Sequence, residues 1–225
     1  REDIIAQARN ILHAPVDVVE WRGDYFSGIL QEDKALDALA ILREILPDTP
    51  LLFTFRTSKE GGVRDISLEE YIKLNKVILS SGILDLIDVE AFIGDEIVSN
   101  IINEAHSKGV KVIASNHDFH KTPPKEEIIR RLIYMQELGA DIAKIAVIPE
   151  NKRDVLTLLE ATLEMSESNG DIPIITMSMA EAGVISRFSG EFFGSALTFG
   201  ALDKASAPGQ INVRELSQVL DILHN

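Results

Sequence analysis

A lysine lies in the middle of an apolar run, DIAKIAVIPE, at residues 141–150. The residues around Lys144 are isoleucine, alanine and valine, a pattern typical of a buried strand. An ammonium group loses much of its hydration in such a place, which is costly without compensation. Lys144 therefore either reaches solvent at the end of the strand or is kept dry for chemistry. A desolvated amine near other cations becomes a nucleophile that attacks carbonyl groups.

A histidine, His117, follows another apolar run in the sequence ASNHDFH. An imidazole titrates near neutral pH, so it can remove a proton from carbon and later return one to a leaving hydroxyl. A lysine that condenses with a ketone and a histidine that moves the neighbouring proton together indicate Schiff-base chemistry. For His117 alone, the role of a hydrogen-bonded structural histidine stays open.

Short β-rich runs alternate with longer stretches in which apolar residues recur at spacings of three and four. Strands are predicted at 16–22, 51–56, 84–90, 110–115, 142–148, 172–177 and 195–199. Helices are predicted at 2–12, 34–46, 68–80, 95–107, 125–138, 152–168 and 212–223. Ser67 and Glu70 form the pattern of a capping box at the start of one of these helices.

Strict alternation of strands and helices predicts an α/β fold with a parallel sheet. Seven predicted strands, with a helix ahead of the first, favour a (βα)8 TIM barrel whose first strand is missing from this chain. No Gly-x-Gly-x-x-Gly follows an early strand, so a dinucleotide-binding sheet lacks its phosphate turn. Without a linker or composition shift, we expect residues 1–225 to form a single catalytic barrel domain, incomplete at its N-terminus.

Polar side chains gather at the carboxyl ends of these strands, where the active sites of such barrels lie. Residues of the same parity share one face of a strand. On this basis one face collects Glu20, Arg22, Arg56, Asp88, Glu90, His117 and Lys144. Such a gathering is costly unless the charges pair or bind a ligand. Two alternatives stay open for these residues. Glu20 could pair with Arg22, and Asp88 and Glu90 with buried cations, or the residues could form a ligand site in which arginines bind a substrate carboxylate.

The composition of the chain limits the classes of binding partner that we expect. The chain has 36 acidic and 22 basic residues and a net charge of −14, which argues against nucleic acid or an anionic membrane as a partner. The absence of cysteine excludes disulfides, thiolate nucleophiles and cysteine-ligated metals. No run approaches the roughly 20 apolar residues of a membrane span. We expect a cytoplasmic protein that acts on a small molecule.

Seven segments carry a resemblance to a known family. In order they are EWRGDYF, LLFTFRTSKEGG, DVEAF, VIASNHDFHKTP, GADIAKIAV, ITMSMAEAGVISRFSGEFFGSALTFG and ASAPGQ. The most specific is DVEA, followed after 20 residues by VIASNHD. Together, from about residue 16 to residue 224, they resemble the type I 3-dehydroquinases.

The resemblance implies a (βα)8 barrel that dehydrates 3-dehydroquinate to 3-dehydroshikimate in the shikimate pathway. The elimination would be syn and would pass through an imine, with no metal or organic cofactor, in a homodimer. Lys144 matches the Schiff-base lysine, His117 the general acid/base, and Glu60 the carboxylate that orients the histidine. The matching substrate-binding positions are Glu20, Arg22, Arg56, Arg187, Ser206 and Gln210. Of these, Arg187 would grip the substrate carboxylate, and Ser206 and Gln210 would belong to a closing loop.

Two other functions remain to be weighed. A class I aldolase also uses a barrel lysine, but its phosphorylated substrates favour a Gly-rich phosphate loop after the late strands, which APGQ matches poorly. A non-catalytic ligand-binding barrel would be expected to have lost Lys144, His117 or Glu60, and all three are present.

Overall fold

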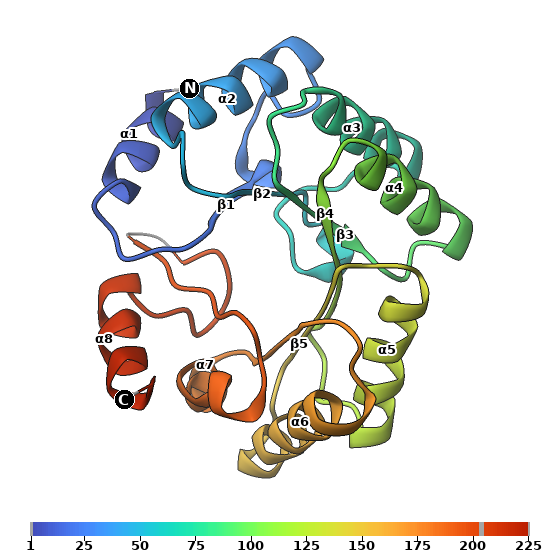
Figure 1. Cartoon of the computed structure of the whole chain (residues 1–225), viewed down its shortest axis with the longest axis vertical. Helices are drawn as coiled ribbons and strands as arrows, with labels where there is room; N and C mark the ends of the chain where they lie inside the picture. Colours follow the sequence, from blue (N-terminus) through green and yellow to red (C-terminus); the bar gives the residue numbers. More distant parts are fainter. Residues whose placement is uncertain (1, 203–204, 225) are drawn as a thin grey trace. The chain divides into compact units, whose positions relative to one another are not determined.

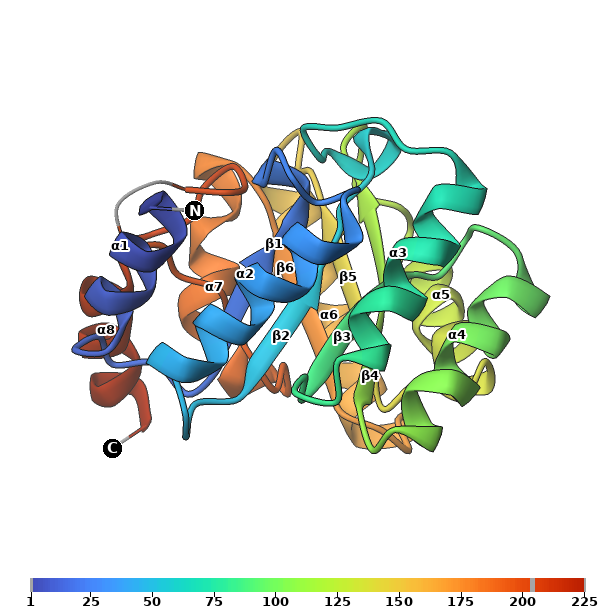
Figure 2. The ribbon, with the colours of Figure 1, turned by 90° about the horizontal axis from the view of Figure 1, so that it is seen from above.

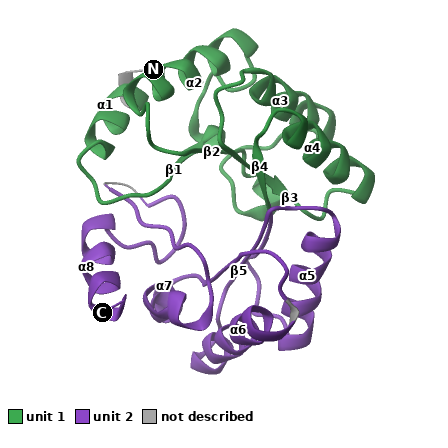
Figure 3. Ribbon diagram, viewed as in Figure 1, with its two compact units in different colours: residues 1–113 green, residues 114–225 purple. Residues whose placement is uncertain are grey.

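Helices and strands alternate along the chain, which the computed structural model describes over residues 2–202 and 205–224 (Figure 1). The chain divides into two units, Arg1–Ile113 (unit 1) and Ala114–Asn225 (unit 2), drawn in green and purple in Figure 3. Six strands form one sheet in the order β1-β2-β3-β4-β5-β6. The pairs whose register is resolved, β1-β2, β2-β3 and β5-β6, are parallel, as predicted.

Unit 1 begins with α1 (Glu2–Ile11), and each of its strands is followed by a helix. The elements are β1 (Val19–Arg22), α2 (Glu32–Ile45), β2 (Leu51–Thr54), α3 (Leu68–Ser80), β3 (Leu86–Glu90) and α4 (Asp95–Ser107). Short 3-10 turns, Gly23–Tyr25 and Ser58–Glu60, follow β1 and β2. The helices α2, α3 and α4 pack side by side (Figures 1 and 2). Strand β4 (Lys111–Asp118) crosses from unit 1 into unit 2.

Unit 2 continues the alternation. Its elements are α5 (Lys125–Glu137), β5 (Ile142–Val147), α6 (Lys152–Glu164), β6 (Ile174–Ser178), α7 (Val184–Ser189) and α8 (Val213–His224). A π-helical turn, Met165–Asn169, continues α6. Helix α5 packs on α6 and β5, and α7 packs on β6 and α8. None of the helices in the described ranges has both the length and the apolar content needed to cross a membrane.

Local sequence explains most of these elements. All four residues of β2, LLFT, are buried, as its continuous apolar pattern indicates. Helix α3 starts where predicted, because the Ser67 hydroxyl accepts the Glu70 N–H and the Glu70 carboxylate accepts the Ser67 N–H. Gly82 follows that helix with a φ of 69°, a conformation that glycine adopts at little cost.

One predicted strand is absent. Residues 195–199 make a single parallel bridge, between Ile174 and Ser195, instead of a strand. The Ala196 N–H still donates to the Ile174 carbonyl at 2.8 Å. The next donor on β6, the N–H of Thr176, is taken by the Ser195 hydroxyl at 3.0 Å, so a side chain replaces a backbone acceptor and the ladder stops. The prediction of seven strands was therefore wrong by one, while a single catalytic domain with an incomplete N-terminus stays a prediction.

Candidate active site

Arg56 is the centre of a charge cluster in unit 1. Its side chain lies just beyond the end of β2 and is only 3% exposed. The guanidinium Nη2 lies 2.7 Å from Asp88 Oδ1, and Nη1 lies 3.3 Å from Glu90 Oε1 and 3.6 Å from Glu60 Oε2. Burial by itself would lower the pKa of Arg56, but the charges of these three carboxylates outweigh burial and raise the pKa above its ordinary value. The predicted role of Asp88 and Glu90 as buried partners of a cation is therefore confirmed for Arg56.

Glu90 also fixes the start of the loop that carries Glu60. Its two carboxylate oxygens accept hydrogen bonds from the N–H and the hydroxyl of Thr57, each at 2.8 Å. The backbone N–H of Glu90 in turn donates to the Tyr71 hydroxyl of α3, at 3.1 Å. The end of β3 thus holds the turn Ser58–Glu60 through Thr57, and this arrangement places Glu60 beside Arg56.

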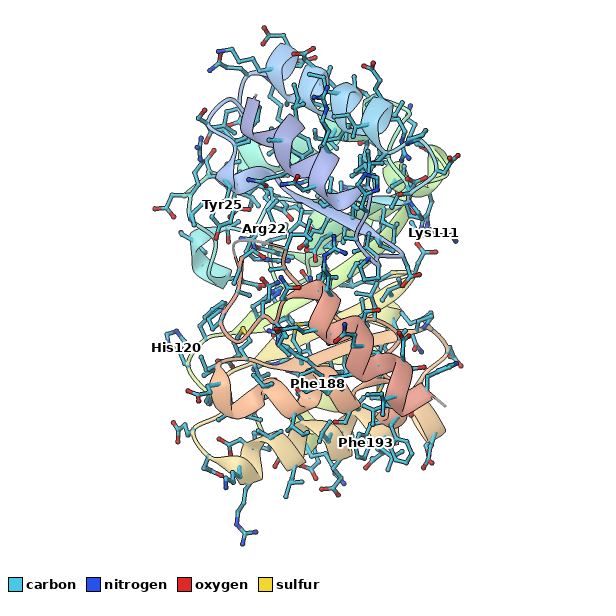
Figure 4. All side chains as sticks on the ribbon, turned by 90° about the vertical axis from the view of Figure 1, so that its left-hand side faces the viewer. Arg22, Tyr25, Lys111, His120, Phe188 and Phe193 are labelled. Atoms are coloured by element: carbon cyan, nitrogen blue, oxygen red, sulfur yellow. The ribbon has the colours of Figure 1, made fainter. Side chains whose placement is uncertain are left out.

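Glu20 and Arg22, both on β1, have different partners: Thr54 of β2 for Glu20, and Asp24 of the turn after β1 for Arg22. The Thr54 hydroxyl donates to Glu20 Oε1 at 2.7 Å. Arg22 makes two hydrogen bonds of 2.8 Å to the fully buried Asp24 carboxylate. Its guanidinium carbon also lies 5.1 Å from the centre of the Tyr25 ring, and Figure 4 labels both residues. Burial opposes the charge on Arg22, but hydrogen bonds and the charge of Asp24 raise its pKa.

Sequence reasoning missed Asp24, which matters as much to this group as the predicted residues. Besides the two bonds from Arg22, its Oδ2 accepts the N–H of Val63 at 3.2 Å. The signal was present as EWRGD, where a glycine separates an arginine from a carboxylate. A carboxylate just after a glycine reads as part of an exposed turn, and only burial reveals that it is a charge partner.

Lys144 is the centre of the second group, in unit 2. It lies in the middle of β5 and is 4% exposed, so the alternative in which it reaches solvent is wrong. Its Nζ lies 4.3 Å from the centre of the Phe199 ring, a distance at which an ammonium is attracted to an aromatic face. Phe199 belongs to the segment 195–199, which had been predicted only as a strand.

His117 lies on β4, next to β5 in the sheet. The strand extends to Asp118, three residues beyond the predicted apolar run, so it includes His117, whose side chain is partly buried. The N–H of Ile148 donates to the Asp118 carbonyl at 3.0 Å, which ties the carboxyl ends of the two strands together. The lysine and the histidine therefore stand on neighbouring strands.

Arg187, on α7, is a buried cation for which residues 2–202 and 205–224 provide no carboxylate partner. It is 1% exposed, and its Nη2 donates to the Pro208 carbonyl at 3.1 Å. Its Nη1 lies 3.6 Å from the Met177 sulfur, and its Nε has no hydrogen-bond partner in the part of the chain that the structure describes. Burial lowers the pKa of Arg187 to about 10, so the guanidinium is still charged at pH 7. A buried donor without a partner is costly, and a bound anion removes that cost.

The loop at 206–210 forms hydrogen bonds within itself and with neighbouring residues. Gln210 Oε1 accepts hydrogen bonds from the N–H and the hydroxyl of Ser206, at 2.6 and 3.2 Å. The Pro208 carbonyl accepts both from Arg187 and from the N–H of Ala180, the latter at 3.2 Å. Ser206 and Gln210 therefore contact each other, and the loop is linked to Arg187, while the roles of the two residues in substrate binding and loop closure stay predictions.

The residues predicted as one site fall into two sets. Unit 1 holds Glu20, Arg22, Arg56 and Glu60, and unit 2 holds His117, Lys144, Arg187, Ser206 and Gln210. Arg56 and Glu60 contact each other directly, and so do Ser206 and Gln210. The pairing of Glu60 with His117 stays a prediction. Within residues 2–202 and 205–224, no three histidine, aspartate or glutamate side chains are grouped so that they could hold a metal ion.

Comparisons with known proteins agree over the full length of the chain. A family model described as type I 3-dehydroquinase matches residues 1–225. A 3-dehydroquinate dehydratase of Salmonella agona is 55% identical over 99% of this chain and 88% of its own length. The crystal structure of the type I 3-dehydroquinate dehydratase of Clostridium difficile with covalent modified comenic acid is 56% identical, with a TM-score of 0.96 over 99% of this chain and 88% of that one.

A more distant structure, the 3-dehydroquinate dehydratase of Enterococcus faecalis, gives a TM-score of 0.92 at 43% identity, over 98% of this chain and 88% of that chain. High structural similarity thus persists where more than half of the residues differ. The agreement confirms the predicted fold class, an α/β fold of the TIM-barrel kind.

Proposed function

This chain belongs to the type I 3-dehydroquinase family, and we propose that it dehydrates 3-dehydroquinate to 3-dehydroshikimate through an imine on Lys144. The observation that carries this proposal is the burial of Lys144, 4% exposed in the middle of β5, on the strand next to His117. Schiff-base elimination needs a buried amine and a proton-transfer group, and here the two lie on neighbouring strands. Membership of the family makes the protein a lyase.

The proposed reaction has four steps. The neutral amine of Lys144 attacks the ketone carbon of the substrate, and loss of water leaves an iminium ion. The iminium withdraws electrons and so acidifies the neighbouring carbon, from which His117 removes a proton. His117 then delivers a proton to the departing hydroxyl, which leaves as water on the same face as the lost proton. Hydrolysis of the imine releases the product and restores the lysine, so the whole cycle consumes no cofactor.

We assign substrate binding to residues of unit 2 first. Arg187 supports the role of carboxylate anchor, because it is buried, charged at pH 7 and has a donor to spare. Ser206 and Gln210 would exchange their mutual hydrogen bonds for substrate hydroxyls. In unit 1, Glu20, Arg22 and Arg56 keep the substrate-binding roles that the resemblance implies, and Glu60 keeps the implied role of orienting the catalytic histidine. A place in the shikimate pathway, a homodimer and a cytoplasmic location complete the proposal, which involves neither nucleic acid nor membrane.

Trapping of the imine tests the proposal. The protein is reduced with borohydride in the presence of 3-dehydroquinate, and the mass of the intact chain and of its peptides is measured. We expect one adduct on the peptide that carries Lys144, and none in Lys144→Ala. A dehydrated adduct distinguishes elimination from the carbon–carbon cleavage of an aldolase, because cleavage would leave a smaller fragment on the lysine.

A second variant separates the two catalytic roles. His117→Ala should still form the adduct, since the lysine is intact, while steady-state turnover falls by about 10²- to 10⁴-fold, the range of general acid–base catalysis. The absence of any adduct in folded wild-type protein would overturn the Schiff-base mechanism. Turnover that survives in Lys144→Ala would overturn it as well.

A further inference from the structure

One side chain, that of Arg131, contacts both neighbours of His117 in the sequence. Successive side chains of a strand point to opposite faces, so Asn116 and Asp118 of β4 share the face opposite to that of His117. Arg131 of α5 reaches this face. Its Nη1 lies 3.0 Å from Asn116 Oδ1 and 3.5 Å from Asp118 Oδ2. One guanidinium nitrogen therefore ties down both neighbours of the histidine.

Arg131 is itself anchored within its helix. Its Nε donates to Glu127 Oε1 at 2.8 Å, one helical turn earlier, and its side chain is 18% exposed. The adjacent Arg130 is 63% exposed and binds Glu127 through Nε and Nη2. Two neighbouring arginines thus share one carboxylate, but only Arg131 continues from it to β4.

Asp118 also accepts hydrogen bonds from the turn after β4 and from the residue after β5. Its Oδ1 accepts the N–H groups of His120, labelled in Figure 4, and Lys121, both at 3.1 Å, which shapes the turn after the strand. Its backbone carbonyl accepts the N–H of Ile148, directly after β5. The contacts of Arg131 therefore bear on the strand end that carries His117 and on its junction with the strand of Lys144.

We propose that Arg131 is a positioning residue for His117, which it holds in register with Lys144 by fixing Asn116 and Asp118 from the helix side of β4. This inference rests on the proposed function, in which His117 moves the proton. The physical basis is that a proton-transfer group works only within hydrogen-bond reach of its target atom. Arg131 contacts β4 on the face opposite to that of His117, so it acts through the geometry of the strand.

The test compares Arg131→Gln with the matched control Arg130→Gln. In Arg131→Gln we expect kcat to fall by roughly 10- to 100-fold with little change in KM, because a misplacement of about 1 Å costs up to roughly 100-fold. Borohydride trapping of the imine on Lys144 should continue at the wild-type level, so the loss lies in the elimination step. Arg130→Gln keeps the contacts to β4 and should keep the wild-type kcat.

A purely structural role for Arg131 would give a different result. Arg131→Gln would then melt at a lower temperature but retain the wild-type kcat per folded molecule, and the inference would be overturned. Loss of the trapped imine in Arg131→Gln would overturn it too, because the defect would then not be confined to His117. If wild-type protein itself forms no imine, the proposed function fails first, whereas a normal wild-type imine with an unaffected Arg131→Gln removes only this inference.

Arg131→Lys provides the second variant if the glutamine variant does not fold. Lysine keeps the charge but offers a compact ammonium instead of a planar fork, so it cannot bind Glu127 and β4 together as arginine does. We expect kcat between those of wild type and Arg131→Gln. A wild-type kcat in Arg131→Lys would mean that charge alone suffices and would overturn the geometric role.

Discussion

Two buried arginines, Arg56 in unit 1 and Arg187 in unit 2, lie in opposite surroundings. Both are nearly inaccessible to solvent, at 3% and 1% exposure. Arg56 has three carboxylates within 3.6 Å, and its pKa is raised although burial opposes this. Arg187 has a carbonyl, a thioether sulfur and an unpartnered Nε, and burial lowers its pKa to about 10.

The difference teaches which buried cations serve the fold and which are ready for a ligand. The charge of Arg56 is balanced inside the protein, so removing the arginine would leave carboxylates unpaired. No carboxylate among the described residues pairs with Arg187, which is the state expected of an anion-binding residue before the anion arrives. The first should therefore affect stability and the second should affect substrate affinity.

The largest expected effect is on stability, in Arg56→Met. The change removes the cationic partner of Asp88 and Glu90, whose side chains are almost fully buried. Removing one partner of a buried ion pair costs about 3–5 kcal/mol of the free energy of unfolding. Urea denaturation with linear extrapolation measures the change. A loss below about 1 kcal/mol, typical of surface pairs, would show that water already balances these carboxylates.

For Arg187 we expect the opposite result, a large effect on substrate affinity and a small effect on stability. Arg187→Met keeps the apolar contacts but removes a charge for which the described residues provide no carboxylate partner. We expect the free energy of unfolding to change by less than about 1 kcal/mol, in either direction. We expect KM for 3-dehydroquinate to rise by roughly 10- to 100-fold, because hydrogen bonds between charged groups contribute about 1.5–3 kcal/mol.

Urea denaturation and steady-state kinetics on the same preparation of Arg187→Met supply both numbers. If this variant lost as much stability as Arg56→Met, the contrast between the two arginines would collapse. An unchanged KM would instead remove Arg187 from the substrate site.

Tyr71→Phe tests a smaller part of the unit 1 cluster. The hydroxyl accepts the backbone N–H of Glu90, and burial raises the pKa of Tyr71, so the hydroxyl stays neutral throughout the working pH range. Phenylalanine preserves the ring contact with Phe55 and leaves one buried N–H without an acceptor. The expected loss is about 1–3 kcal/mol of unfolding free energy, measured in urea. A stability equal to that of wild type would mean that a water molecule takes over as acceptor.

Local signals made much of this fold predictable. Periodicity and the capping box of Ser67 placed α3, and a continuous apolar run placed β2. The strand at 195–199 failed because the Ser195 hydroxyl competes with the backbone for Thr176, and no periodicity reports such competition. Asp24 was missed because its turn looks exposed in the sequence.

The candidate site was predictable in its residue types but not in its pairing. Strand parity and the apolar run around Lys144 singled out the amine without knowledge of its ring partner, Phe199. The contrast between Arg56 and Arg187 could not be predicted, because it depends on which acceptors the fold brings near each guanidinium. For Arg187 that acceptor is the carbonyl of Pro208, 21 positions along the chain.

The smallest expected effect comes from an exposed pair, and it separates the contribution of burial from that of pairing. Glu127 accepts hydrogen bonds from Arg130 and Arg131, which lower the pKa of Glu127 to about 2. Because the folded-state pKa lies below the unfolded value of about 4.3, the stabilisation is fully present above that value. It is lost as the pH falls through about 2.

Glu127→Gln should therefore cost only about 0.5 kcal/mol at pH 7, since the carboxylate is solvated and screened by salt. Its stability should converge with that of wild type as the pH approaches 2, where the wild-type carboxyl is itself becoming protonated. Urea denaturation at pH 7 and pH 3, at low and high salt, measures both trends. A loss at pH 7 as large as that of Arg56→Met would show that pairing alone stabilises this protein. A small, salt-sensitive loss would show that burial, and not the number of ion pairs, sets the stability effect of Arg56.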